Sequence, residues 1–263
     1  MAEAIPGVPW CDLVRADNPS PMTLDGTNTY LIRTDEGTVV IDPGPLLADH
    51  VHAVTATDPP PVLAIVTHHH PDHSEASQEW HRRTGAPVRA LDADQCVAGE
   101  PLTDGELITC GAVRLRVLHT PGHTADSICL NAELDSTAVL FSGDTILGRG
   151  TSIVAHPDGR LGDYLASLQR LRETARAATP TMVLLPAHGP PGADVATVVD
   201  EYISHRHMRL DQVRAAVASG ARTAQEVVEI VYADVDRSVW GAARSTVEAQ
   251  LDYLRSQPAG SDT

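Results

Sequence analysis

The sequence predicts an α+β fold followed by a small helical unit. Segments that alternate or run apolar, as strands do, recur between residues 27 and 189, with helix-like stretches among them. From Val195 to Leu254 every pattern is helical, and the Pro- and Gly-rich stretch GPPGAD separates the two regions. A chain of 263 residues is long enough for one large domain and an appendage. We therefore expect a domain over residues 1–192 and a second over 193–263.

The first region holds the expected strands. They are predicted at 27–34, 37–44, 62–70, 113–119, 127–132, 138–144 and 182–189. A helix is expected over 74–85, where Gly85 ends it, and an amphipathic helix over 161–178, where apolar residues recur every three or four positions.

The helical unit has a defined start signal and a defined apolar face. Thr223 and Glu226 form a T-x-x-E capping box, which predicts a helix that begins at about Ala224. The apolar face of a last helix is expected to consist of Val239, Ala243, Val247, Leu251 and Leu254.

Charge argues against a protein built to hold nucleic acid. The net charge is −16, and all 19 basic residues are arginine. Residues 200–263 carry seven arginines against ten acidic residues, so even the helical unit is slightly acidic. Proteins that grip phosphates usually show a basic stripe. Nucleic acid is thus disfavoured as a partner, although a local basic patch stays open, and a small-molecule substrate is preferred.

The sequence also favours a cytoplasmic location. The first residues, MAEAIPGVPW, lack the basic and apolar segments of a secretory signal, and no run approaches the roughly 18 apolar residues of a membrane span. Four scattered cysteines without a CxxC pair are expected to be free thiols in a reducing compartment. The oligomeric state is left open.

The segment HHHPDH at residues 68–73 is the strongest chemical signal. His68 and His70 lie at the end of the predicted strand 62–70 and, as alternate residues of a strand, are expected to point to one side. Pro71 then turns the chain, so that Asp72 and His73 can face the same space. Imidazole and carboxylate groups are ligands that zinc favours. A polar loop is the alternative, but four such groups are costly to bury without a partner.

Three later residues strengthen the prediction of a metal site. Three motifs place one residue each at the end of a predicted strand: His123 in HTPGHT, Asp144 in FSGDT and His188 in LLPAHG. Sites are commonly built where strands end at one edge of a sheet. We therefore expect all seven side chains to surround metal ions.

Together these motifs resemble the metallo-β-lactamase superfamily over roughly residues 25–190. The resemblance implies a four-layer αββα sandwich with two metal ions at one edge, most simply zinc. It implies that His68, His70 and His123 hold one ion, that Asp72, His73 and His188 hold the other, and that Asp144 bridges them. The resemblance implies that Asp42 in VIDPG supports the metal-bearing loops without binding a metal ion itself. His70 stands where the flavodiiron branch has Glu, which favours zinc over a redox di-iron centre.

Further motifs resemble a β-lactamase-like branch of the superfamily with a C-terminal winged-helix-like cap. These are GTNTYLI, VIDPGP, GDTILGRGT and PDGRLGDYLASLQRL. The expected function is a binuclear zinc hydrolase that uses a metal-bound hydroxide to cleave an ester, thioester or amide bond, with Asp72 and Asp144 as catalytic residues. The alternative is an endoribonuclease or phosphodiesterase that acts on single-stranded RNA, as some members of the branch do. A metal-binding module without catalysis is disfavoured, because structural zinc sites use four ligands and no bridging carboxylate.

Other polar residues receive lesser roles. His69 is expected to face away from the ligands, and His119 to make a supporting hydrogen bond. Arg149 is the candidate for substrate contact, because guanidinium suits a carboxylate or phosphate. His205, Arg206 and His207 are expected on a solvated helix face, from which they could also reach over the site. The helical unit is expected to cover the mouth of the metal cleft; a dimerisation unit is the alternative.

Overall fold

The fold is built on two packed β-sheets in a computed structural model that describes residues 2–134 and 136–257. Met1 and residues 258–263, which the two predicted domains include, lie outside the described residues. The first sheet has the order β1 (Glu3–Ile5), β2 (Val8–Arg15), β3 (Asn28–Thr34), β4 (Gly37–Ile41), β5 (Pro61–Ile65), β6 (Val88–Arg89). The second has the order β11 (Met182–Pro186), β10 (Thr137–Gly143), β9 (Ile128–Leu134), β8 (Val113–His119), β7 (Leu107–Cys110).

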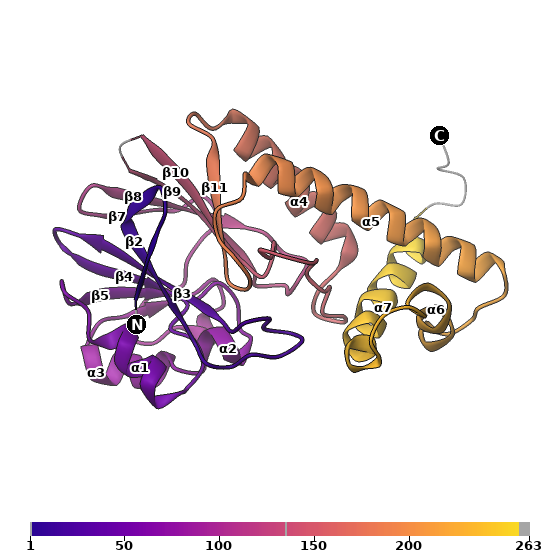
Figure 1. The fold of residues 1–263 in the computed structure, drawn as a ribbon, viewed down its shortest axis with the longest axis horizontal. Helices are drawn as coiled ribbons and strands as arrows, with labels where there is room; N and C mark the ends of the chain where they lie inside the picture. The colour runs from indigo at the N-terminus through magenta and orange to yellow at the C-terminus, as the bar shows by residue number, and fades with distance from the viewer. Residues whose placement is uncertain (1, 135, 258–263) are drawn as a thin grey trace.

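Helices cover the outer face of each sheet. Against the first sheet lie α1 (Ala48–Thr55) and α3 (Ser77–Thr84), which bury Val54 and Trp80. Against the second lie α4 (Leu161–Ala177) and the first half of α5 (Val195–Ala218), with Tyr164, Leu168 and Val199 in the core. A third core, which includes Ile32, Leu115 and Phe141, fills the space between the sheets. The layers are therefore αββα, as Figure 1 shows, and the predicted sandwich is confirmed.

The remaining elements are short or belong to the C-terminal unit. The loops of the sandwich carry α2 (Pro71–Ser74) and the 3-10 helix η1 (Ala93–Gln95). The C-terminal unit adds α6 (Ala224–Val231), the 3-10 helix η2 (Arg237–Val239) and α7 (Trp240–Ser256). The capping box of Thr223 and Glu226 is present as predicted. Gly85 ends α3 in the left-handed conformation, with φ of 73°, also as predicted.

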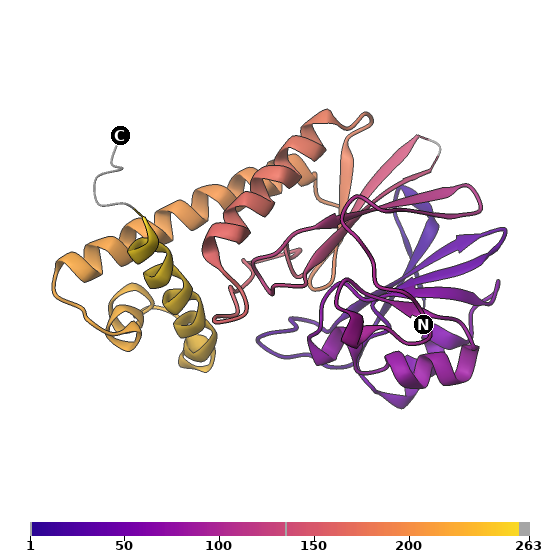
Figure 2. The ribbon, with the colours of Figure 1, turned by 180° about the vertical axis from the view of Figure 1, so that it is seen from behind.

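The long helix α5 belongs to two cores at once. Its first half packs on α4 through Val195, Val199 and Tyr202, whereas Val213 and Ala216 pack against α6 and α7. Figure 2 shows α5 running from the sandwich to the C-terminal helices. The predicted boundary at residues 192 and 193 falls in the loop before α5 and stays a prediction.

Several sequence predictions differ from the structure in their details. The strands β1, β2, β6 and β7 and the helix α1 had no prediction. The predicted strand 62–70 ends at Ile65. The predicted helix 74–85 corresponds to α3, which begins at Ser77, and the short helix α2 precedes it. All four cysteines are free thiols, as expected. Among the described residues, no helix is both long and apolar enough to cross a membrane.

Candidate metal centre

The loop after β5 carries the first ligands, and Asp42 holds it in place. Because β5 ends at Ile65, the expectation that His68 and His70 face one side as alternate residues of a strand was wrong. Asp42 follows β4 in the left-handed region, with φ of 55°. Its carboxylate accepts hydrogen bonds from the backbone N–H of Thr67, at 2.7 Å, and from the Thr67 hydroxyl, at 2.9 Å. The side chain of Asp42 thus replaces the strand pairing that the loop lacks.

Asp42 also orients a predicted ligand directly. Its Oδ2 lies 2.8 Å from Nδ1 of His73, and both side chains are buried. With Nδ1 bound to a carboxylate, Nε2 of His73 is the nitrogen that faces the site. Carboxylate–histidine pairs of this kind fix the ring of a metal ligand and raise its basicity. The structure therefore places Asp42 where the supporting role requires it.

One group of four potential ligands forms around His70. Potential ligand atoms of His68, His70, His123 and Asp144 all lie within 4.8 Å of one another. Nδ1 of His70 is 3.0 Å from Nε2 of His68 and 3.1 Å from Nε2 of His123. The other nitrogen of His123 lies 2.9 Å from the carbonyl oxygen of Ile153, to which it can donate. Burial lowers the pKa of His123, which favours the neutral ring, and in that form Nε2 is free to ligate.

A second group lies beside the first. Asp72, His73 and His188 also bring their ligand atoms within 4.8 Å of one another. Oδ2 of Asp72 is 3.3 Å from Nε2 of His73 and 3.2 Å from Nε2 of His188. The hydroxyl of Thr27, which the sequence analysis did not single out, donates to the same oxygen at 3.0 Å.

Asp144 lies between the two groups. Its Oδ2 is 3.6 Å from Nε2 of His123, and its Oδ1 is 3.3 Å from Nε2 of His188. Each oxygen thus faces a different group, as a bridging carboxylate requires. The structure brings all seven predicted ligands together in the two sets that the resemblance implied.

The donor set fits metal ions better than it fits hydrogen bonds within the protein. Nε2 of His73 and Oδ1 of Asp144 are buried without a hydrogen-bond partner in the described part of the chain. Burial lowers the pKa of His70 to about 4, so the ring is neutral at pH 7, the form that binds metal. Burial alone lowers the pKa of His188, but the adjacent Asp144 and Asp72 raise it to about 9. The carboxylates thus attract positive charge to the centre, which a dication supplies.

The Asp42→Asn variant tests the supporting role of the carboxylate. We expect zinc affinity to fall by about 10- to 100-fold, because the ring of His73 loses its charged partner. Titration of the metal-free protein with zinc against a competing chelator measures the change. Asp49→Asn, an exposed carboxylate in the first turn of α1, is the control and should bind zinc as the wild type does. Equal affinities in the two variants would contradict the role assigned to Asp42.

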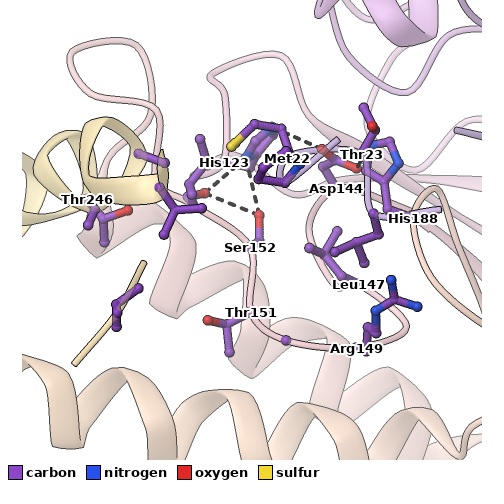
Figure 3. A pocket seen from close by; sticks show the side chains of 18 of the residues that line it. Met22, Thr23, His123, Asp144, Leu147, Arg149, Thr151, Ser152, His188 and Thr246 are labelled. Carbon is purple, nitrogen blue, oxygen red and sulfur yellow. Dashed lines mark hydrogen bonds and ion pairs between the residues drawn. The ribbon is translucent and has the colours of Figure 1, made fainter. Parts of the chain in front are cut away.

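The centre opens into a cavity of about 440 Å³. His70, Asp72, His123, Asp144 and His188 line it, and so do residues of the C-terminal unit, including Val235, Val239, Ala243 and Thr246. Figure 3 shows Asp144 and His188 on one side of this pocket and Thr246 of α7 on the other. The C-terminal unit therefore forms a wall of the cavity, in agreement with its expected place over the cleft.

The remaining predicted residues lie at or near the rim. Arg149 lines the cavity, but its guanidinium forms two hydrogen bonds with the carboxylate of Asp25, the Nη2–Oδ1 bond being 2.9 Å. Nε2 of His119 lies 2.9 Å from the carbonyl oxygen of Ala125, in the loop just after His123. His69 turns to Asp126, with Nδ1 2.8 Å from Oδ1, and belongs to neither ligand group. Substrate contact by Arg149 and support by His119 stay predictions.

One part of the cavity was not foreseen. Arg206 was expected on a solvated face of its helix, yet it is 3% exposed and lines the cavity together with His205 and Arg209. Arg206 packs on Tyr164 of α4 and donates a hydrogen bond to the carbonyl oxygen of Ser152. The periodicity of α5 alone does not reveal a face that contacts with other segments bury. His207 is exposed as expected.

Comparisons with known proteins agree with the fold and the donor set. The family model of the metallo-beta-lactamase superfamily matches residues 22–188, and that of the beta-lactamase associated winged helix domain matches residues 223–257. Beta-lactamase-like protein 2 homolog from Caenorhabditis elegans is 32% identical over 90% of this chain and 81% of its own length. Atrochrysone carboxyl ACP thioesterase from Aspergillus chevalieri is 31% identical over 86% of this chain and 74% of its own length.

Solved structures support the same assignment. A metallo-beta-lactamase family protein from Thermus thermophilus has a TM-score of 0.76 and 25% identity, covering 94% of this chain and 93% of that one. The match includes the C-terminal helices as well as the sandwich. With a matching sandwich and a matching C-terminal domain, the chain belongs to the metallo-beta-lactamase superfamily of hydrolases and carries the winged-helix domain associated with it.

Proposed function

We propose that the protein is a binuclear zinc hydrolase that cleaves an ester, thioester or amide bond of a small molecule. The observation that carries the proposal is the position of the two ligand groups at the wall of a cavity of about 440 Å³, a size suited to a small ligand. One ion would be held by His68, His70 and His123, and the other by Asp72, His73 and His188. Asp144 would contact both ions. When bound, two such ions activate water and stabilise negative charge on the reacting group.

The side chains around the centre complete the site. Thr27 fixes the carboxylate of Asp72, which is one-quarter exposed and lines the cavity, so Asp72 can orient water and accept a proton from it. Leu147, Ile153 and Val239 give the cavity an apolar wall that shields the reacting bond from bulk water. An apolar wall suits an acyl group better than a polynucleotide backbone, which supports the small-molecule proposal over RNA.

Two further observations bear on the substrate and the location. One relative is named an ACP thioesterase, which makes thioesters the first class to test. The four free thiols suit a reducing compartment such as the cytoplasm.

A substrate panel tests the proposal. Zinc-loaded protein should contain two ions per chain by elemental analysis and should hydrolyse acyl thioesters of N-acetylcysteamine and aryl esters. Treatment with a chelator should abolish turnover, and zinc should restore it. Single-stranded RNA serves as the competing substrate. One ion per chain, or cleavage of RNA without any hydrolysis of esters, thioesters or amides, would be incompatible with the proposal.

A further inference from the structure

Three basic side chains of α5 face the cavity and have no acidic partner among the residues that the structure describes. His205, Arg206 and Arg209 all line it. In the described part of the chain, neither arginine has a carboxylate within 4.0 Å, the distance that defines the ion pairs of this structure. Nδ1 of His205 and Nε of both arginines are buried and lack a hydrogen-bond partner among the same residues.

Of the three side chains, Arg206 gives the strongest evidence that an anionic partner is needed. It is 3% exposed, and a buried guanidinium without a counter-ion is energetically unfavourable. The protein has 35 acidic and 19 basic residues, so acidic side chains are abundant, yet none pairs with Arg206 among the described residues. Arg149, in the same cavity, has the pairing with Asp25 that Arg206 lacks.

Both guanidinium groups are held in place while their Nε atoms stay unpaired within the described residues. Arg206 stacks on the ring of Tyr164, at 4.7 Å from its centroid, and donates a hydrogen bond from Nη2 to the carbonyl oxygen of Ser152. Arg209 stacks on Tyr232 at the same distance and donates to the carbonyl oxygen of Val231 at 3.2 Å. Such positioning lowers the entropic cost of binding a ligand.

The rest of the cavity connects these arginines with the metal centre. Metal-ligand residues, the apolar side chains of Leu147, Val235 and Val239, and the two arginines all line the same space. A molecule that fills this space meets the metal-ligand side chains, an apolar surface and a cationic group. The cavity thus matches a substrate that carries a charge apart from its reactive bond.

We propose that Arg206 and Arg209 form an oxyanion subsite, so that the substrate is an apolar molecule with a carboxylate or phosphate separate from the bond that is cleaved. This inference rests on the proposed function, because it takes the reactive bond to lie at the metal centre. Arginine binds either oxyanion through paired N–H groups, so the shared chemistry is a planar or tetrahedral group of oxygens with negative charge.

Binding of uncleaved probes tests the subsite separately from catalysis. The first pair is 8-oxononanoic acid, which carries a carboxylate, and 2-nonanone, which is neutral; both are ketones without a bond that a hydrolase can cleave. Calorimetry on the zinc-loaded protein should show that the acid binds roughly 10- to 100-fold more tightly, the contribution expected of a charged hydrogen-bonded pair. A second pair, in which a phosphate ester replaces the carboxylate, identifies the source of the oxyanion by its relative affinity.

Variants test whether the two arginines cause the tighter binding of the charged probe. Arg206→Gln and Arg209→Gln should each lower this preference by about tenfold. Arg214→Gln should leave it unchanged, because Arg214 lies on the same helix, pairs with Asp211 and does not line the cavity. Arg209 is only partly buried, so its variant keeps the test decisive if Arg206→Gln does not fold.

The outcomes separate the subsite from the proposed function. An oxyanion preference that survives in both arginine variants, or no preference in the wild type, would overturn the subsite even if thioesters are hydrolysed. If the variants remove the preference for the charged probe, the subsite is supported even when no ester, thioester or amide is hydrolysed. In that case only the proposed reaction would be wrong. In active protein, the same variants should raise KM for ω-carboxyacyl thioesters more than for their neutral counterparts.

Discussion

Asp144→Ala is expected to lower kcat/KM by roughly 10³-fold or more, because a metal centre contributes several kcal/mol of transition-state stabilisation and each 1.36 kcal/mol is a factor of ten. Asp144 is the side chain whose two oxygens face the two ligand groups separately, towards His123 and His188. Without it, two dications would lie close together with less negative charge between them. We therefore expect the variant to bind fewer than two zinc ions per chain.

The fold should tolerate this change better than the site does. In the metal-free protein, burial alone raises the pKa of Asp144, and charge interactions with His188 and His73 lower it well below its usual range. Removing a desolvated carboxylate also removes its desolvation penalty, which offsets part of the lost interaction. The metal-free variant is therefore expected to unfold within about 1–2 kcal/mol of the metal-free wild type.

Three measurements decide the case for Asp144. These are kcat/KM on the best thioester of the panel, zinc content by elemental analysis, and chemical unfolding of the metal-free proteins. Asp163→Asn, an exposed carboxylate in the first turn of α4, is the matched control and should behave as the wild type in all three. Wild-type turnover with two zinc ions in Asp144→Ala would remove the bridging role.

Sequence reasoning identified the seven side chains that the structure brings together because each lies in a short motif near the end of a strand. It predicted the convergence of His68 and His70 for the wrong reason, since a strand does not extend through them. The geometry depends instead on Asp42, which lies 25 residues before Thr67 along the chain and bonds it twice. A hydrogen bond between distant side chains leaves no periodicity in the sequence.

The parts of the molecule that escaped prediction have physical reasons in common. Most residues of the strand β2 are buried, so apolar and polar residues do not alternate along it. Asp12 interrupts its apolar run, and Arg15 ends it. Arg206 was missed because contacts with Tyr164 of α4 and with Ser152, both distant along the chain, bury it despite the polar pattern of α5. The two cores that share α5 depend on contacts with α4 and with α6, which local patterns along α5 do not specify.

The glycine of the PGHT motif has a steric role that leads to a second large effect. Gly122 has φ of 141°, a conformation that side chains rarely adopt. A Cβ atom there would lie 2.3 Å from Cα and 2.6 Å from the backbone nitrogen of Tyr164, far inside contact distance. Tyr164 is itself fully buried in α4, and its hydroxyl donates to the carbonyl oxygen of Thr145 at 2.6 Å. The helix therefore has little freedom to move away.

Gly122→Ala is accordingly expected to destabilise the protein by about 3–5 kcal/mol, the sum of backbone strain and overpacking against α4. Chemical unfolding measures the loss, and two controls separate its causes. Gly85→Ala carries a positive φ of 73° with open space around it, so it should lose only about 1–2 kcal/mol. Gly162→Ala lies within α4, with its nearest neighbour at 3.5 Å, and should be neutral or stabilising.

If Gly122→Ala lost no more stability than Gly85→Ala, α4 would not press against the loop before His123. His123 follows Gly122 directly along the chain. If Gly122→Ala loses the full stability expected, zinc binding should weaken as well, which would connect the packing of α4 with the metal centre.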